Sequence, residues 1–353
     1  MTYIPKNMLD FQKTFPPPAS YKRPDGSTRF AFMTFVMRND SFVPGALVFA
    51  HALRQQRTQA DLVCMVTKDV TPAARAALEI LFDRLVEVEE IFIPHKRRQE
   101  RQDRPFLFTR FLALRAGGDG GLGLGYEKIV LADADVLPLR CYDHLFTLEA
   151  PAGILNEDKS FCMEYDADGR YILPASVAED GTWKWHQHYG SLCPHGTKIP
   201  KEITDRVLTD PANMGVNSSL WVLRPSLAEY ENVLAEANRP EVNERIGSAF
   251  DWPEMQFATL HWSGQWTSID LRFSSFNGYP QLDVLCGTHF AGYKPWKFKG
   301  RGTILRFSRF PDYALWHKLY LGMLGEHPGL QKVSRLSRLE SEIRALSKNK
   351  SPR

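Results

Sequence analysis

Apolar runs and amphipathic stretches alternate along the first third of the chain. Residues 30–37 and 61–67 are continuous apolar runs, as expected of strands that a parallel sheet buries on both faces. Between them, residues 44–56 begin with a proline and place apolar side chains at helical spacing, which predicts a helix. Residues 71–84 predict a second helix, with Thr71 as its N-terminal cap.

The same alternation continues up to residue 139. Residues 85–93 predict a strand, residues 106–116 a helix, and residues 127–139 a long strand that follows a glycine-rich loop. Strand–helix alternation of this kind predicts an α/β fold with a mainly parallel sheet and helices on both faces. Ligands of such sheets bind beyond the carboxyl ends of the strands, so that edge is where we expect a site.

Three segments depart from this alternation. Residues 1–28 are rich in proline and polar side chains, which predicts an extended N-terminal arm. Residues 156–212 contain few periodic runs and many aromatic, glycine and proline residues, which predicts an insert that acts as a lid or an acceptor-side loop. Residues 331–353 predict a basic helical tail. We therefore expect one domain over residues 29–330 that carries the insert.

Composition narrows the class of protein. A chain of 353 residues with 43% apolar content can bury a large core, and a formal charge of +3 gives no indication of a nucleic-acid partner. Five widely spaced cysteines favour a reducing compartment over a disulfide scaffold. The first residues lack the apolar core of a signal peptide, and no run approaches the roughly 18 apolar residues of a transmembrane helix. We expect a cytoplasmic protein.

A pair of carboxylates ends the last of these apolar runs. Asp133 and Asp135 flank Ala134, which keeps the turn small and leaves space for a ligand. Residues i and i+2 of an extended backbone point to the same side, so both carboxylates can face one point beyond the sheet. Hard divalent cations prefer such oxygen ligands and often bridge them to phosphate oxygens. The alternative is that both aspartates only cap the next turn.

Four segments resemble glycosyltransferase family 8, the family of glycogenin, galactinol synthases and bacterial galactosyltransferases. In the family's order, they are residues 39–47 (NDSFVPGAL), 126–135 (YEKIVLADAD), 216–226 (VNSSLWVLRPS) and 289–296 (HFAGYKPW). The resemblance implies a GT-A type, Rossmann-like nucleotide-sugar-binding fold. It also implies a metal-dependent retaining transfer of a hexose from a UDP-sugar to a hydroxyl of a carbohydrate, protein or small-molecule acceptor. A homodimer is compatible with it.

The resemblance also implies roles for single residues. Asp133, Asp135 and His289 would bind manganese, or alternatively magnesium. Lys294 would meet the diphosphate and Phe42 would stack on uracil. The full set of implied donor contacts is Asn39, Phe42, Arg110, Asp133, Ala134, Asn217, Ser218, Gly292 and Lys294.

The candidates for stabilising the cationic sugar come from a segment that departs from the family's pattern. The family has an Asp-Gln pair before a helix, where this chain has residues 252–256 (WPEMQ). Glu254 takes the place of the aspartate and Gln256 is the nearby amide, and the sequence leaves open which one faces the reacting carbon. Only Tyr293 separates Gly292 from Lys294, where the family often has two residues.

Other readings stay open for several residues. His289 can be a core histidine and Lys294 a solvated one. The insert contains His186, His188, Cys193 and His195, whose spacing permits a zinc site without matching a closed ligand pattern. Its aromatic side chains Trp183, Trp185 and Tyr189 are candidates for acceptor contacts. The basic run at residues 95–104 predicts a solvated face or a loop over the donor site.

Two other functions remain possible for the same motifs. An Asp-x-Asp after an apolar strand also occurs in phosphatases of the haloacid dehalogenase type, although those carry it on the first strand of their core. A non-catalytic carbohydrate-binding or UDP-sugar-binding protein on the same fold is the other alternative. The retained carboxylate pair, histidine and lysine argue against a loss of activity.

Overall fold

The computed structural model describes residues 11–97, 102–161, 164–165, 171–172, 182–279, 281–298 and 310–348. A seven-stranded sheet with the order β10-β6-β9-β4-β1-β2-β3 forms its centre. In that order, the strands are Thr267–Ser268, Ala152–Leu155, Val216–Leu223, Lys128–Ala132, Phe30–Val36, Asp61–Val66 and Arg84–Glu87. A second sheet has the order β11-β12-β5, with bounds Ser275–Phe276, Gly287–His289 and Val136–Pro138. A two-stranded sheet pairs β7 (Glu164–Tyr165) with β8 (Tyr171–Ile172).

The central sheet is mainly parallel, as the alternation of strands and helices predicts. β1 pairs in parallel with β2 and β4, β2 with β3, and β6 with β10. Only β9 runs antiparallel, between β4 and β6. Every residue of β9 is buried, because neighbouring strands and helices cover it on all sides.

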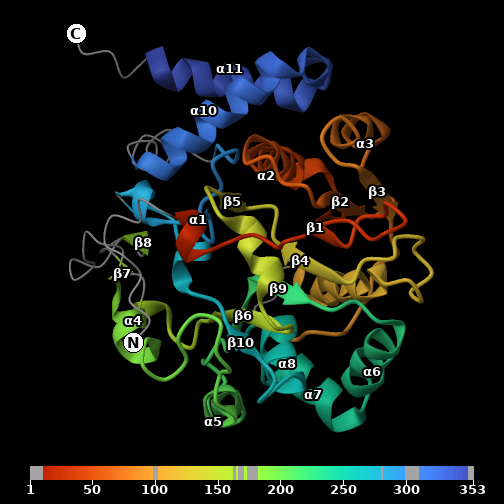
Figure 1. The fold of residues 1–353 in the computed structure, drawn as a ribbon, viewed down its shortest axis with the longest axis vertical. Helices are drawn as coiled ribbons and strands as arrows, with labels where there is room; N and C mark the ends of the chain where they lie inside the picture. Colours follow the sequence, from red (N-terminus) through yellow and green to blue (C-terminus); the bar gives the residue numbers. More distant parts are fainter. Residues whose placement is uncertain are drawn as a thin grey trace.

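Helices cover both faces of the sheet. The α-helices are α1 (Phe11–Thr14), α2 (Val43–Gln55), α3 (Pro72–Leu78), α4 (Lys184–Tyr189), α5 (Lys201–Thr204), α6 (Leu227–Ala237), α7 (Pro240–Ser248), α8 (Pro253–His261), α10 (Pro311–Glu326) and α11 (Ser334–Lys348). In Figure 1, α2 and α3 lie together on one side of the strands, and α6, α7 and α8 lie on the other. Right-handed crossovers place α2 and α3 on one face and the connection from β3 to β4 on the opposite face. The predicted α/β architecture is confirmed.

Helix α2 approaches the sheet so closely that one of its residues must be glycine. A Cβ at Gly45 would lie 2.3 Å from the carbonyl oxygen of Ala134 and 2.5 Å from the ring of Trp296. No side chain fits in that space, so glycine allows the backbone of α2 to touch the turn after β4.

Four elements differ from their predicted form. The strand expected over residues 85–93 is only β3, which ends at Glu87. The helix expected over residues 71–84 ends at Leu78, because Asp83 already bonds to the backbone of Leu62 and the chain joins the sheet there. The helix expected over residues 106–116 is a 3-10 helix, η2 (Arg104–Ala116). The strand expected over residues 127–139 divides into β4 and β5 at the turn that contains the carboxylate pair.

The two terminal segments pack against the domain where the structure describes them. In the arm, Phe15 and Tyr21 are buried, and the Tyr21 hydroxyl donates to Asp143. In the tail, α11 buries Leu336 and Ile343 beside α10. None of the helices in the described part of the chain has the length and apolar character that crossing a bilayer requires. Residues 1–10 and 349–353 lie outside the described residues.

A pair of histidines connects the arm to the core. The backbone N–H of Asp270 donates to Nδ1 of His195 over 3.0 Å, so the proton of this ring sits on Nε2. That nitrogen lies 2.8 Å from Nε2 of His144, whose Nδ1 lies 3.3 Å from the carbonyl oxygen of Pro16 in the arm. The chain of hydrogen bonds requires both rings to be neutral, because a second proton on either ring would put two donors face to face.

We expect the protein to lose stability as the pH falls from about 6.5 to about 4. Burial lowers the pKa of His195 to about 4, whereas an unfolded histidine titrates at about 6.5. Between these values the unfolded chain binds more protons than the folded one, so acid favours unfolding, by a total of about 3 kcal/mol. Urea denaturation of the wild type and of His195→Gln at pH values across this interval checks the expected loss of stability. The variant should show a smaller dependence on pH, and His188→Gln, which changes an exposed histidine, should keep the wild-type dependence.

Candidate active site

The carboxylate pair lies where the chain leaves one sheet for another. β4 ends at Ala132, the N–H of Asp133 donates to the carbonyl of Ser219 on β9, and the N–H of Val136 returns to the carbonyl of Asp133. From Val136 the chain runs as β5, which pairs with β12 so that Val136 lies opposite His289. This pairing brings a distant histidine next to Asp135.

Asp133, Asp135 and His289 form one cluster of potential metal ligands. One ligand atom from each residue lies within 4.8 Å of the others, and Nε2 of His289 is 3.4 Å from Oδ1 of Asp135. The Nδ1 of His289 is buried and has no hydrogen-bond partner in the described part of the chain. Two carboxylates and an imidazole are a suitable set for manganese and related divalent cations, so the residues present fit such an ion.

Lys294 holds the second oxygen of Asp135. Its ammonium group pairs with Oδ2 of that carboxylate and donates to the carbonyl of Phe290 over 2.6 Å. Burial alone would raise the pKa of Asp135, but the positive charges of Lys294 and His289 outweigh it and hold the pKa well below its usual range. Asp135 is therefore ionised and ready to bind a cation at neutral pH.

Arg110 positions the other carboxylate. This buried guanidinium projects from η2, donates to the carbonyl of Ser218 over 2.6 Å and reaches Oδ1 of Asp133 over 3.1 Å. Burial raises the pKa of Asp133, and the positive charge of Arg110 opposes that shift. Arg110 thus fixes Asp133 against β9 and partly compensates for its burial.

Glu254 and Gln256 share the helix α8 but have different surroundings. Oε1 of Glu254 accepts a hydrogen bond from the Ser218 hydroxyl over 3.1 Å and lies 3.9 Å from Arg110, while its buried Oε2 has no partner in the described part of the chain. The Gln256 amide donates to the carbonyls of Pro211 and Asn213 and accepts from the N–H of Trp252. Gln256 is fully buried, so its geometry favours a structural role and leaves Glu254 as the candidate for catalysis.

An open cleft of about 800 Å³ lies in front of the carboxylate pair. Volumes of this order accommodate ligands of nucleotide size. The residues that line it are Phe35, Met37, Arg38, Asn39, Ser41, Phe42, Gln102, Asp103, Leu107, Arg110, Asp133, Ala134, Asp135, Ala291, Gly292, Tyr293, Lys294 and Lys297. The cleft therefore joins the loop before α2 to the carboxylates and to the segment after β12.

Comparisons with known proteins show what the chain is similar to. No family model matches the chain. Galactinol synthase 1 of Arabidopsis thaliana is 23% identical over 287 residues, which cover 77% of this chain and 72% of that protein. Glycogenin-1 of Oryctolagus cuniculus is 34% identical over 119 residues, which are 34% of each chain. The matched part is thus about a third of glycogenin-1. The chain is therefore similar to proteins named glycogenin and galactinol synthase, in agreement with the resemblance of its motifs.

One further relative and one solved structure match most of the chain. The uncharacterised protein R707 of Acanthamoeba polyphaga mimivirus is 26% identical over 313 residues, which cover 82% of this chain and 93% of its own. The crystal structure of the galactosyltransferase LgtC in complex with donor and acceptor sugar analogues aligns with a TM-score of 0.52 at 12% identity, over 82% of this chain and 94% of that one. At that identity the likeness establishes the fold, which is of the GT-A type.

The cleft of the glycosyltransferase brings together most of the donor contacts that the resemblance implies. Asn39, Phe42, Arg110, Ala134, Gly292 and Lys294 line it with both aspartates. Asn217 and Ser218 lie on β9 behind this wall, where the Asn217 side chain accepts a hydrogen bond from the N–H of Ser219 over 2.8 Å. His289 stands behind Asp135 and completes the cluster without lining the cleft.

Sequence reasoning missed two cations of the cleft. Lys297 has its ammonium group 4.5 Å from the centroid of the Phe42 ring, and its position three residues after Lys294 was the available signal. Arg38 lies two residues after the end of β1. Its φ is 66°, a backbone conformation that residues other than glycine rarely adopt. Its guanidinium lies 3.9 Å from the ring of Phe106 and donates to the carbonyl of Gln102. The turn residues after residue 37 marked this bend but gave no indication of its role.

The aromatic side chains of the insert are not at the surface. Trp183, Trp185 and Tyr189 are buried in the core, so their expected contact with an acceptor is wrong. His186 contacts the carboxylate of Asp270 and His195 pairs with His144, and among the described residues the insert's histidines and Cys193 form no group of potential metal ligands. Residues 162–163, 166–170 and 173–181 of the insert lie outside the described residues, as do residues 98–101 of the basic run.

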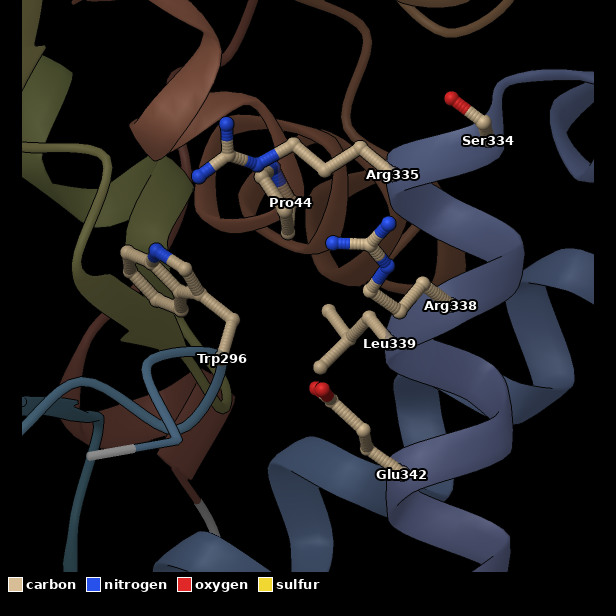
Figure 2. Close-up of a pocket in the computed structure, with 7 residues that line it drawn as sticks. All are labelled: Pro44, Trp296, Ser334, Arg335, Arg338, Leu339 and Glu342. Atoms are coloured by element: carbon tan, nitrogen blue, oxygen red, sulfur yellow. The ribbon is translucent and has the colours of Figure 1, made fainter. Parts of the chain in front are cut away.

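A second cavity lies on the other side of the first turn of α2. Its volume is about 310 Å³, and Figure 2 shows Arg335 and Arg338 projecting from α11 towards Pro44 and Trp296. The described residues that line it include no aspartate or histidine, so it does not offer the ligands of the first site. Trp296 contributes to both places, because its indole N–H donates to the carbonyl of Ser41 at the rim of the cleft.

Proposed function

We propose that this glycosyltransferase moves a hexose from a UDP-sugar to an acceptor hydroxyl, with a divalent metal and with retention of anomeric configuration. The observation that carries the proposal is the cluster of Asp133, Asp135 and His289 at the wall of a cleft of about 800 Å³. The names of its relatives, a galactinol synthase and glycogenin, agree with a hexose as the transferred group.

Asp133, Asp135 and His289 are the residues that would hold the cation, which we propose to be manganese. When bound, a divalent cation neutralises the charge that develops on the leaving diphosphate. Lys294 lies beside Asp135 and supplies a second positive charge at the same place. We assign it to the diphosphate, because the cation would compete with it for Oδ2 of Asp135.

The other end of the cleft suits the nucleoside. Phe42 presents a ring there between Trp296, whose centroid is 5.7 Å away, and the ammonium group of Lys297. A half-buried aromatic ring of this kind can stack on a base. The Asn39 side-chain oxygen already accepts from the N–H of Ser41, so its amide group is the part that we assign to uracil.

The reaction can proceed without a dedicated protein base. The acceptor oxygen forms a bond to the anomeric carbon on the face from which the diphosphate oxygen leaves, and a diphosphate oxygen takes the acceptor's proton. Glu254 is the carboxylate that we assign to stabilising the positive charge on the sugar. Its buried Oε2 without a partner is the observation that supports this role.

Glu254→Gln is expected to lower kcat about 100-fold with little change in KM, because the charge on the sugar develops only in the transition state. The melting temperature should change little, since the amide oxygen can still accept the bond from the Ser218 hydroxyl. Glu241→Gln is the matched control, because Glu241 occupies the first turn of α7 as Glu254 occupies that of α8 but is exposed. Equal kcat in the Glu254 variant and the wild type would remove Glu254 from the mechanism.

A titration with UDP, with and without manganese, tests the function as a whole. We expect calorimetry to give tight binding only with the metal, followed by slow hydrolysis of one member of a panel of UDP-sugars. Metal-dependent binding with no turnover of any sugar would instead support a carbohydrate-binding protein on this fold. Hydrolysis of simple phosphomonoesters in place of UDP-sugars would support a phosphatase.

A further inference from the structure

A second cluster of potential metal ligands lies outside the cleft, where α2 meets the end of α10. It consists of His51 on α2, Glu326 at the last position of α10 and His327 directly after it. One ligand atom from each residue lies within 4.8 Å of the others. These residues have no part in the proposed transfer, since none of them lines the cleft.

The distances in this cluster suit an ion better than a direct contact. Nδ1 of His51 and Oε2 of Glu326 are 3.9 Å apart, which is too long for a hydrogen bond. Two ligands at about 2.0–2.1 Å from one tetrahedral zinc ion are about 3.4 Å apart. Glu326 is exposed over 58% of its side chain, so it can close the remaining gap without disturbing the core.

The two imidazoles are fixed from different directions. His51 is 1% exposed within α2, and its ring lies at 89° to that of His327 with centroids 6.4 Å apart. The backbone N–H of His327 donates to the carbonyl of Met323, so the last turn of α10 sets the position of this residue. Edge-to-face rings allow one nitrogen of each to point at a common centre.

Gln55 supplies a supporting contact. Its amide nitrogen is placed 3.0 Å from Nε2 of His51. The oxygen and nitrogen of such an amide are assigned from the hydrogen-bond network, and the opposite assignment lets the amide oxygen accept from Nε2–H. A metal-binding histidine usually has a partner of this kind on its second nitrogen, which leaves Nδ1 free to bind the ion.

We propose that His51, Glu326 and His327 bind one zinc ion that fastens the C-terminal helices to α2. Two imidazoles and one carboxylate are a ligand set typical of zinc, with water at the fourth position. α2 begins at Val43, immediately after the cleft residue Phe42, and packs against α10. The ion would therefore stabilise the helix that supports the nucleoside end of the cleft without taking part in the reaction.

Zinc titration of the full chain in the Asp135→Ala background tests this site, because that substitution weakens the first cluster. We expect one zinc ion per chain and a rise in melting temperature on binding. Glu326→Gln and His327→Gln should each weaken the binding at least about 10-fold. Glu326→Gln is an isosteric change of an exposed side chain, so the variant should fold as its parent does. Made in the otherwise wild-type chain, Glu326→Gln should keep the metal-dependent transfer.

His188→Gln serves as the control, since His188 is exposed and distant in sequence from the cluster. It should leave the zinc affinity unchanged. Absence of zinc binding in the Asp135→Ala protein would overturn the proposal. The same holds if Glu326→Gln and His327→Gln bind zinc as tightly as their parent, or if the control loses the affinity instead.

Discussion

Replacing Asp135 with alanine is expected to lower metal-dependent transfer by at least about 1,000-fold. The substitution removes the carboxylate that lies between His289 and Lys294, and with it one of the three ligands of the proposed cation. The fold should survive, because Lys294 keeps its hydrogen bonds to the carbonyls of Phe290 and Ala291. Manganese binding by calorimetry and kcat on the identified UDP-sugar measure the effect.

A matched control for this change is Asp69→Ala. Asp69 is an exposed aspartate that follows strand β2, much as Asp133 and Asp135 follow β4, but it does not line the cleft. Its loss should leave both manganese affinity and turnover at the wild-type level. Undiminished turnover in Asp135→Ala, at the same manganese concentration, would contradict the proposed metal site.

Arg110→Ala is expected to damage both stability and activity. Arg110 is 3% exposed and is a cation beside the partly buried carboxylate of Asp133 and the buried carboxylate of Glu254. Without it, the Asp133 carboxylate and the carbonyl of Ser218 lose a charged hydrogen-bond donor, and Glu254 loses a nearby positive charge. Breaking a buried pair in this way typically costs about 3–5 kcal/mol, so the free energy of unfolding should fall by that order.

Two further variants separate charge from geometry at this position. Arg110→Lys keeps the positive charge but has no planar fork to reach Ser218 and Asp133 together, so it should recover part of the stability and little of the activity. Arg115→Ala on the same helix removes an arginine that bonds to the carbonyl of Gly120, and it should leave turnover unchanged. Urea denaturation and kcat should be measured on Arg110→Ala, Arg110→Lys and Arg115→Ala. Together they separate the contribution of the charge from that of the hydrogen-bond geometry. Wild-type stability in Arg110→Ala would contradict the structural role assigned to this residue.

The fold was predictable where local sequence determines it. The apolar runs at residues 30–37 and 61–67 became β1 and β2, and the stretch between them that begins with a proline became α2, because burial on both faces and apolar positions at helical spacing leave clear patterns. The position of the carboxylate turn followed from the end of the apolar run. In each case the deciding interactions lie within a few residues of one another.

Features that depend on distant contacts were not predictable in this way. The approach of His289 to Asp135 follows from the pairing of β12 with β5, and only the resemblance to a family indicated it. Tryptophan and tyrosine suit carbohydrate surfaces and protein cores equally well, so the composition of the insert could not show that Trp183 and Trp185 are buried. The role of Gln256 was open for a similar reason, because a side-chain amide can hydrogen-bond either to a substrate or to backbone groups, as it does here.

The missing side chain at Gly45 has a consequence for how this enzyme would select its donor. α2 touches the backbone of Ala134 directly. The distance between the loop that carries Phe42 and the turn that carries Asp133 and Asp135 is therefore fixed. A fixed distance of this kind would select a donor by the length between its aromatic base and its diphosphate. It would place no condition on the sugar beyond the diphosphate. Evolution could then exchange the sugar and the acceptor freely while the nucleotide stayed the same.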